Sequence, residues 1–210
     1  MFSRFVAKQL SGPSMVVGQW LLAPLWNRRN MALNNVALER LALQADDQVL
    51  EVGFGGGYLL GQMLSSVSSG LVAGIDASRA MIVYCEKRYQ RFQQSGRLEL
   101  HYASVQAIPY GSAYFTKVCS VNSIFYWPDV AQGIGECGRV LGEGGVLVLC
   151  FTSKASLGRR AFARHGLHLY DGDEVGEMMK RAGLGDITIE ARADRHRTFW
   201  SVVGKKGGKG

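Results

Sequence analysis

The sequence predicts an α/β fold: a doubly wound, seven-stranded sheet that is mostly parallel and ends in an antiparallel C-terminal hairpin. First, five short apolar runs bounded by turn residues alternate with helix-like segments between residues 48 and 151. Second, two more strand patterns, residues 187–192 and 198–206, follow one another with few residues between them. Strands that alternate with helices build a parallel sheet covered on both faces, whereas two adjacent strands build a hairpin.

Each element has its own pattern. Ahead of the first strand, "NMALNNVALERLAL" places Leu33, Val36, Ala37 and Leu41 on one face of a helix. The strands of the alternating part are expected at residues 48–53, 71–76, 98–104, 117–123 and 146–151. The connecting helices are expected at residues 60–67, from the N-cap Ser78 to Phe92, and from Asp129 to Leu141, with a "GEGG" turn before the fifth strand. Another helix is expected at residues 173–182, ahead of the hairpin.

The length of the chain and the distribution of its charges indicate how its domains are organised. The chain has 210 residues, 47% apolar and 20% charged, which suits one globular domain. We expect that domain at residues 45–204, preceded by a helical lid segment, 1–44, and followed by a disordered basic tail, 205–210. The net charge of +7 favours an anionic partner, and residues 1–38 contain four basic residues and no acid.

The composition also bears on compartment and metals. The four cysteines form no CxxC pair, and three of them fall within apolar strand or helix patterns, which predicts buried free thiols in a reducing compartment. His165 and His168 have no acid or cysteine at ligand spacing, so no metal site is expected. The apolar run "MVVGQWLLAPLW" is too short to span a bilayer and has no cleavage site after it. We expect a cytoplasmic protein whose basic N-terminus could still contact a membrane surface.

The stretch "VLEVGFGGGYLL" joins a strand to a helix through four glycines, preceded by Glu51. Such a turn admits positive φ angles and lets the backbone approach a ligand at the carboxyl end of the strand. A dinucleotide fingerprint would need a glycine where Tyr58 stands, and no Walker lysine follows. Asp76 ends the second strand, where a carboxylate can accept hydrogen bonds from an adenosine ribose. Glu51 would repel a pyrophosphate and suits a cationic ammonium group.

These motifs resemble the class I S-adenosylmethionine-dependent methyltransferases, which have a Rossmann-like fold, in the small-molecule subgroup that includes quinone-biosynthesis enzymes. The matching stretches, in family order, are "EVGFGGG", "GIDASRAMI", "ASVQAIPY", "NSIFYWPD" and "ECGRVLGEGGVLVL". The resemblance implies S-adenosylmethionine as cofactor, held by Glu51, Gly53, Gly55, Gly57, Asp76, Ala77, Met81, Ser104, Val105 and Asn122. Many relatives have aspartate where Ser104 stands, so a hydroxyl would replace the usual acceptor for the adenine amino group.

Methyl transfer from a sulfonium is an in-line displacement, so the protein mainly aligns the nucleophile and excludes water. The candidate catalytic residues are Tyr126 and Trp127, on the loop after the fourth strand, and His168 as a base. Each has a simpler alternative, in which it packs in the core or lies on the surface. Asn122 is expected at the end of the fourth strand, where the resemblance implies a backbone contact with the methionine ammonium.

Three classes of acceptor remain open. A small molecule leads, because "NSIF" is not the NPPY-like turn of enzymes that methylate amino groups of nucleic acids and glutamine. A membrane-associated lipid amine or quinone precursor is the alternative, and an RNA or protein the further one; the core motifs show no basic stripe that would favour nucleic acid. A cofactor-binding module without activity is the remaining reading. Residues 1–35 are expected to form a lid that closes the acceptor pocket against Tyr126 and Trp127.

Overall fold

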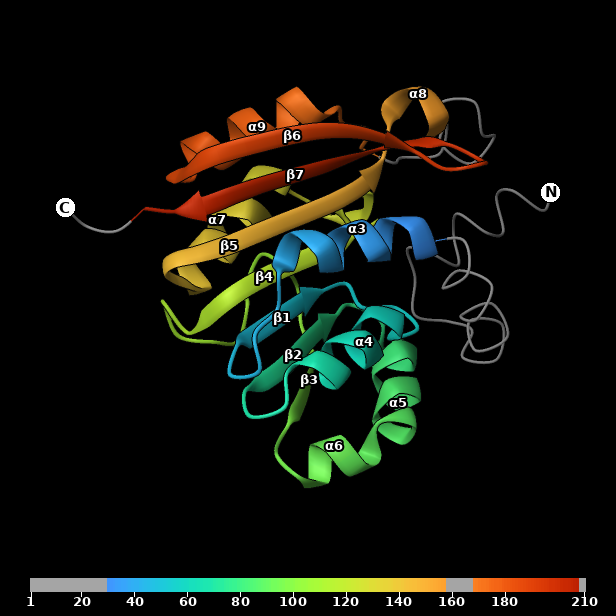
Figure 1. The fold of residues 1–210 in the computed structure, drawn as a ribbon, viewed down its shortest axis with the longest axis vertical. Coiled ribbons are helices and arrows are strands. Elements are labelled where there is room, and N and C mark those ends of the chain that lie inside the picture. Colours follow the sequence, from blue (N-terminus) through green and yellow to red (C-terminus); the bar gives the residue numbers. More distant parts are fainter. Residues whose placement is uncertain (1–29, 158–167, 208–210) are drawn as a thin grey trace.

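The computed structural model describes residues 30–157 and 168–207, which form one seven-stranded sheet with strand order β3-β2-β1-β4-β5-β7-β6 (Figure 1). The first five strands pair in parallel, whereas β7 pairs antiparallel with both β5 and β6. The predicted fold class is therefore confirmed. The strands are β1 (Gln48–Val52), β2 (Leu71–Asp76), β3 (Leu98–Tyr102), β4 (Phe115–Val121), β5 (Leu141–Thr152), β6 (Leu184–Ala193) and β7 (Thr198–Lys206).

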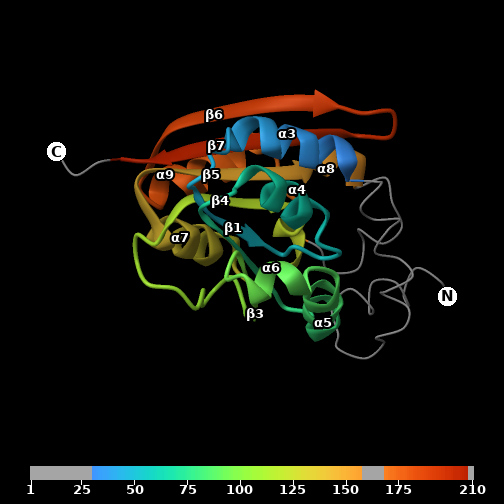
Figure 2. The same ribbon diagram turned by 60° about the horizontal axis from the view of Figure 1, so that its bottom comes forward.

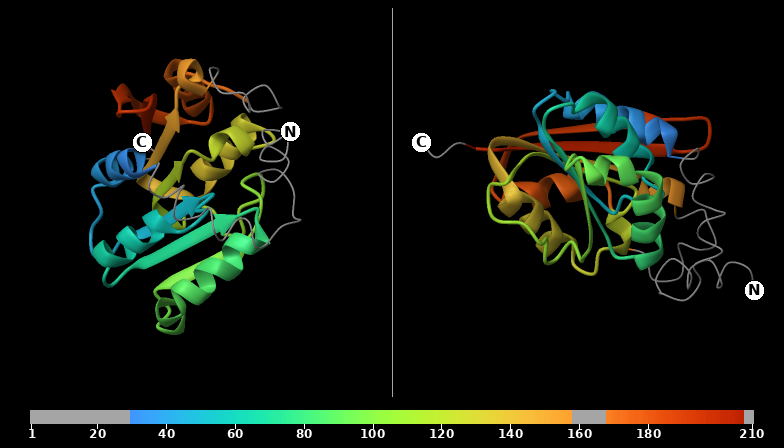
Figure 3. Two further views of the ribbon diagram at one scale, coloured as in Figure 1. Left: turned by 90° about the vertical axis from the view of Figure 1, so that its right-hand side faces the viewer. Right: turned by 90° about the horizontal axis from the view of Figure 1, so that it is seen from below.

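Helices cover both faces of this sheet, as expected for parallel strands. The described helices are α3 (Met31–Leu41), α4 (Tyr58–Ser66), α5 (Arg79–Arg88), α6 (Gln90–Gln94), the 3₁₀ helix η1 (Ile124–Tyr126), α7 (Val130–Val140), α8 (Lys154–Leu157) and α9 (Gly172–Arg181). One apolar cluster joins α3, α4 and α5 to the sheet, and a second joins α7 and α9 to its other face. Figure 3 shows α3 and α4 on the side of the sheet opposite α7.

Helix α3 belongs to the domain core. Its residues Leu33, Ala37 and Leu41 are fully buried, as their helical spacing predicts, and the helix lies along β5 and β7 (Figure 2). The expected lid boundary at residue 44 is therefore wrong for residues 31–41, because this apolar stripe packs on the sheet. Residues 1–29 of the expected lid segment lie outside the described residues, and the lid remains a prediction.

The other end of the domain also differs from expectation. The tail expected from residue 205 begins too early, because Lys205 and Lys206 belong to β7, as the strand pattern at residues 198–206 predicts. The Nζ atom of Lys206 donates hydrogen bonds to the carbonyls of Gly138 and Leu141, at 2.8 and 2.6 Å. An ammonium at the C-terminal end of α7 satisfies carbonyls that have no partner within the helix, which explains why this basic residue is ordered.

Three element boundaries differ for physical reasons. Strand β4 ends at Val121 rather than Ser123, because Asn122 has a left-handed φ of 56°. The expected "GEGG" turn lies within β5, where the β4–β5 register shifts. The predicted helix to Phe92 is wrong as one element: Tyr89 separates α5 from α6, with φ −117° and ψ 20°, and its hydroxyl donates to the Gly57 carbonyl at 2.6 Å.

The strand order places one crevice at the centre of the sheet. From β1 the chain moves outward to β2 and β3, and then returns to β4 on the other side of β1. In open α/β sheets, ligands bind at such a reversal, beyond the carboxyl ends of the strands. The turns after β1, β2 and β4 are thus the place to look for a site. Within the described ranges, 30–157 and 168–207, no helix is long and apolar enough to cross a membrane.

Candidate cofactor and acceptor site

The glycine turn after β1 has three residues with positive φ: Gly53 at 75°, Gly55 at 50° and Gly57 at 68°. The three glycines differ in which atoms surround them. A Cβ atom on Gly53 would lie 2.5 Å from the Cβ of Ser123, and one on Gly57 would lie 2.6 Å from the Sγ of Cys85. A Cβ atom on Gly55 would meet no atom of the described residues within 4 Å. Gly53 and Gly57 thus permit packing within the protein, whereas Gly55 faces the open side on which a ligand fits.

Asp76, at the end of β2, holds this turn in place. Its Oδ2 accepts a hydrogen bond from the backbone N–H of Gly55 at 2.9 Å, and its Oδ1 accepts one from that of Ser78 at 2.8 Å. Burial raises the pKa of Asp76, and these two N–H groups partly oppose the rise. The structure therefore brings Asp76 and the glycine turn together, as the sequence predicted.

Glu51 is buried beneath the turn, with 3% of its surface exposed. Burial, with the nearby charge of Asp76 as the second cause, raises its pKa well above the usual value, while a hydrogen bond from the Leu60 backbone opposes the rise. Its Oε2 atom has no hydrogen-bond partner among the described residues. A buried carboxylate oxygen without a partner is costly, and a cationic group in the crevice would compensate it. Glu51 thus fits the ammonium of a methionine arm.

The third motif lies beside Asp76, because the Ala103 N–H donates to the Asp76 carbonyl at 3.2 Å. Ser104 is exposed, and its Oγ accepts a hydrogen bond from the Gln106 N–H at 3.2 Å. Val105 is buried. Ala77, which follows Asp76 directly, is exposed, and Met81 is buried at the start of α5. The predicted adenine-binding residues therefore surround the end of β2, and their contacts with adenine remain predictions.

The acceptor side begins at the end of β4. Ser123 joins this end to β1: its Oγ donates to the Val52 carbonyl at 3.1 Å and accepts from the indole N–H of Trp127 at 3.0 Å. Trp127 is 4% exposed and packs in the core, as its simpler alternative expects, and its role in the acceptor pocket remains a prediction. Tyr126, by contrast, is 42% exposed.

His168 lies next to residues 158–167, which the structure does not describe. It is exposed and stacks on Tyr170, with ring centroids 6.5 Å apart. Burial, followed by the charge of Asp129, raises the pKa of Tyr170, so this aromatic pair lies near the start of α7. The proposed role of His168 as a base remains a prediction. His165 lies outside the described residues.

The side chains that pack against the glycine turn, Tyr89 and Cys85, were not predicted from the sequence. Tyr89 fills the space left by two glycines, since a Cβ on Gly61 would lie 2.6 Å from its hydroxyl oxygen and one on Gly57 would lie 3.0 Å from its ring. Cys85 lies beside it, with its Sγ 3.6 Å from the Gly55 carbonyl. The only sequence signal was Gly61 in an otherwise regular helical pattern, which indicates a close neighbour but does not name it.

Comparison with known proteins decides the family. Residues 50–149 match the model of a methyltransferase domain. An uncharacterized methyltransferase of Bacillus subtilis, YdaC, is 34% identical over 161 residues, which cover 77% of this chain and 84% of that protein. The chain belongs to the class I S-adenosylmethionine-dependent methyltransferases. The methyltransferase is thus an enzyme whose cofactor is S-adenosylmethionine, as the glycine turn, Glu51 and Asp76 predicted.

Some other relatives are longer than this chain. The 27-O-demethylrifamycin SV methyltransferase of Amycolatopsis mediterranei is 30% identical, over 79% of this chain and 64% of that protein. Among solved structures, the putative methyltransferase complexed with the Haloferax volcanii activator Trm112 has a TM-score of 0.79 at 17% identity, covering 91% of this chain and 96% of that one. Phosphoethanolamine N-methyltransferase 2 of Haemonchus contortus has a TM-score of 0.70 at 15% identity, covering 83% of this chain and 52% of that one. These structural likenesses show the shared fold.

When bound, S-adenosylmethionine supplies the activated methyl group, and the protein has to hold and orient it. Gly55 leaves room beside the turn, the Glu51 oxygen without a partner among the described residues suits the ammonium, and the Asp76 carboxylate would accept hydrogen bonds from the ribose. Within residues 30–157 and 168–207, no group of three or more histidine, cysteine, aspartate or glutamate side chains could hold a metal ion.

Binding of S-adenosylhomocysteine is expected to depend on pH through Glu51. Below its raised pKa, the free protein holds Glu51 protonated, whereas the ligand ammonium favours the carboxylate. Binding therefore releases a proton, and affinity should rise as pH increases from the usual carboxyl range to the raised pKa, then level off. Calorimetry across this range measures the effect. Glu51→Gln should bind more weakly and lose most of the rise; identical pH profiles for both proteins would contradict the assignment.

Proposed function

We propose that the methyltransferase acts on a small organic molecule, with N, O, S or C as the accepting atom. The supporting observation is the exposed ring of Tyr126, which follows the end of β4 by a few residues. An exposed aromatic side chain shortly after the carboxyl end of β4 would suit an apolar or aromatic acceptor. Residues 121–129 contain no lysine or arginine, whereas phosphate contacts by such residues dominate nucleic-acid binding.

The names of the relatives favour the same class of acceptor. Besides the rifamycin enzyme, a rice 2-methyl-6-phytyl-1,4-hydroquinone methyltransferase is 29% identical, over 68% of this chain and 42% of that protein. The substrate in the name of that enzyme is a phytyl-substituted hydroquinone, so a membrane-associated quinone precursor is the second candidate. The supporting observation for that candidate is the acid-free N-terminal sequence with its two tryptophans.

One labelling experiment distinguishes these classes of acceptor. The full chain is incubated with methyl-labelled S-adenosylmethionine and, separately, with hydroquinones and other small phenols and alcohols, phosphatidylethanolamine vesicles, total RNA and unfolded protein. Label in a small organic product supports the proposal. Transfer confined to vesicle lipids, to RNA or to protein overturns it, and Asp76→Ala serves as the control with weakened cofactor binding.

Substitution of Tyr126 tests its role in the acceptor pocket. Tyr126→Ala removes an exposed aromatic surface, so the KM for the accepted small molecule should rise by about tenfold, the equivalent of roughly 1.4 kcal/mol. Affinity for S-adenosylhomocysteine should stay unchanged, because Tyr126 lies outside the predicted cofactor contacts. Tyr126→Phe is the matched control, which keeps the ring. An unchanged KM for Tyr126→Ala would remove this residue from the acceptor pocket.

A further inference from the structure

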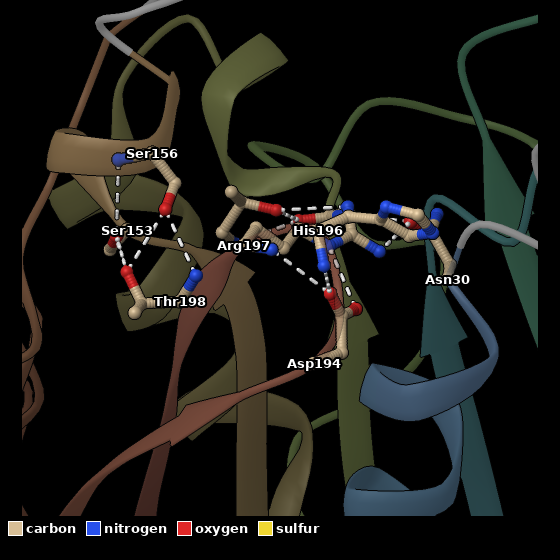
Figure 4. Close-up of polar contacts among 9 residues, drawn as sticks. Asn30, Ser153, Ser156, Asp194, His196, Arg197 and Thr198 are labelled. Carbon is tan, nitrogen blue, oxygen red and sulfur yellow. Dashed lines mark hydrogen bonds and ion pairs between the residues drawn. The ribbon is translucent and has the colours of Figure 1, made fainter.

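Four side chains form a closed ring of hydrogen bonds at the carboxyl ends of β4 and β5. Asn122 Nδ2 donates to Asn30 Oδ1 at 2.8 Å, and Arg197 Nη2 donates to the same oxygen at 3.1 Å. Arg197 Nη1 donates to Thr152 Oγ1 at 3.1 Å, and Thr152 Oγ1 donates to Asn122 Oδ1 at 3.1 Å. The Thr152 backbone N–H also donates to Asn122 Oδ1, at 2.9 Å. Figure 4 shows Arg197 reaching from the β6–β7 turn toward Asn30.

Two of the four side chains in the ring are buried, and the charge in it is balanced by a neighbouring carboxylate. Thr152 is 1% exposed, and the Arg197 side chain is 6% exposed. Arg197 Nε also donates to Asp194 Oδ2 at 3.3 Å. Although burial opposes it, hydrogen bonds from the His196 backbone and Arg197 hold the pKa of Asp194 below its usual value. Hydrogen-bonded polar networks make the groups that they join more rigid, so this ring holds its four side chains in fixed positions relative to one another.

The backbone of one of these four residues is strained. Asn122 has a φ of 56°. This left-handed conformation is higher in energy for residues other than glycine, although the cost is smaller for asparagine than for most of them. Such strain persists where surrounding contacts determine the conformation, and it gathers at functional sites. Asn122 lies at the reversal between β1 and β4, and the next residue, Ser123, contacts Gly53 of the glycine turn. The strained backbone therefore lies beside the cofactor crevice.

We propose that Asn122 and Arg197 are positioning residues for the cofactor: the hydrogen-bond ring holds the residue-122 backbone in its left-handed conformation, where it lines the crevice. The ring thereby makes cofactor affinity depend on the β6–β7 turn. The proposal concerns the binding site of S-adenosylmethionine, and it does not depend on the identity of the methyl acceptor. A guanidinium can donate to Thr152 and Asn30 at once, because its two terminal nitrogens form a fork, whereas a lysine ammonium is a single point.

The test compares two substitutions of Asn122 in the full chain, with S-adenosylhomocysteine as the probe. Both Asn122→Ala and Asn122→Gly remove the side-chain hydrogen bonds, but glycine adopts a left-handed φ without strain. Calorimetry should show a Kd about tenfold higher for alanine, from roughly 1–2 kcal/mol of backbone strain. For glycine it should show a Kd within about threefold of the original protein. The midpoint temperature of thermal unfolding should fall in both variants, since both lose the hydrogen-bond ring.

A second pair tests the link through Arg197. Arg197→Lys keeps the positive charge beside Asp194 but breaks the fork, and it should raise the Kd by about threefold, roughly 0.7 kcal/mol. In the Asn122→Gly protein the same change should leave the Kd unaffected, because glycine no longer needs the ring. The proposal is overturned if glycine loses as much affinity as alanine, if none of the changes alters the Kd, or if the Arg197 effect is equal in both backgrounds. Should Asn122→Ala fail to fold, the Arg197 pair decides alone.

Discussion

Gly55→Val will abolish binding of S-adenosylhomocysteine and leave the protein folded. The Cβ of valine at this position would meet no atom of the described part of the chain within 4 Å, so the new side chain would occupy the space expected for the cofactor. The positive φ of 50° adds strain, because β-branched residues rarely adopt it. Together we expect a loss of more than about 100-fold in affinity, roughly 2.7 kcal/mol or more. Calorimetry measures the binding, and circular dichroism checks the fold.

Gly53→Ala is the matched control, because it changes the same turn on its packed side. Here the new Cβ would lie 2.5 Å from the Cβ of Ser123, which must move for the protein to fold. We therefore expect a drop in thermal stability, in contrast to the binding defect of Gly55→Val. Normal binding by a folded Gly55→Val protein would show that the cofactor does not occupy the open side of the turn.

The fold was predictable because its signals are local. Strand and helix patterns in the sequence depend on burial of one face or stripe, and α3 shows this with Leu33, Ala37 and Leu41 all buried where their spacing predicts. The glycine turn and Asp76 were predictable for the same reason, since the strand ends bring them together in any parallel sheet. Boundaries were less predictable: Asn122 leaves β4 early because of contacts with Thr152 and Asn30, which are distant in sequence.

The parts of the site that could not be predicted all depend on long-range packing. Trp127 and Tyr126 are adjacent aromatic residues, and the sequence gives no reason for one to be buried and the other exposed. The hydroxyl of Ser123 decides between them by accepting the Trp127 indole N–H. Arg197 likewise reads as one basic residue in a polar turn, and its importance becomes visible only when the β6–β7 hairpin brings it to Asn30.

Asp76→Ala will weaken binding of S-adenosylhomocysteine by about 1–3 kcal/mol, the cost of losing hydrogen bonds to a charged group. The carboxylate has two roles: it accepts the backbone N–H groups of Gly55 and Ser78, and it is predicted to accept the ribose hydroxyls. Asp76→Asn is the matched control, because its amide can still accept one of these hydrogen bonds, and we expect an intermediate loss.

Adenosine, which lacks the methionine arm, separates the role of Asp76 from that of Glu51. If Asp76 binds the ribose, Asp76→Ala should weaken adenosine and S-adenosylhomocysteine by a similar factor. Glu51→Gln should weaken only S-adenosylhomocysteine, since only this ligand presents an ammonium to the buried Glu51 oxygen that has no partner among the described residues. Calorimetry with both ligands gives four affinities for comparison with the unchanged protein. Adenosine binding unaffected by Asp76→Ala would remove the ribose assignment, because the ribose is common to both ligands, while the Glu51 result would still report on the ammonium.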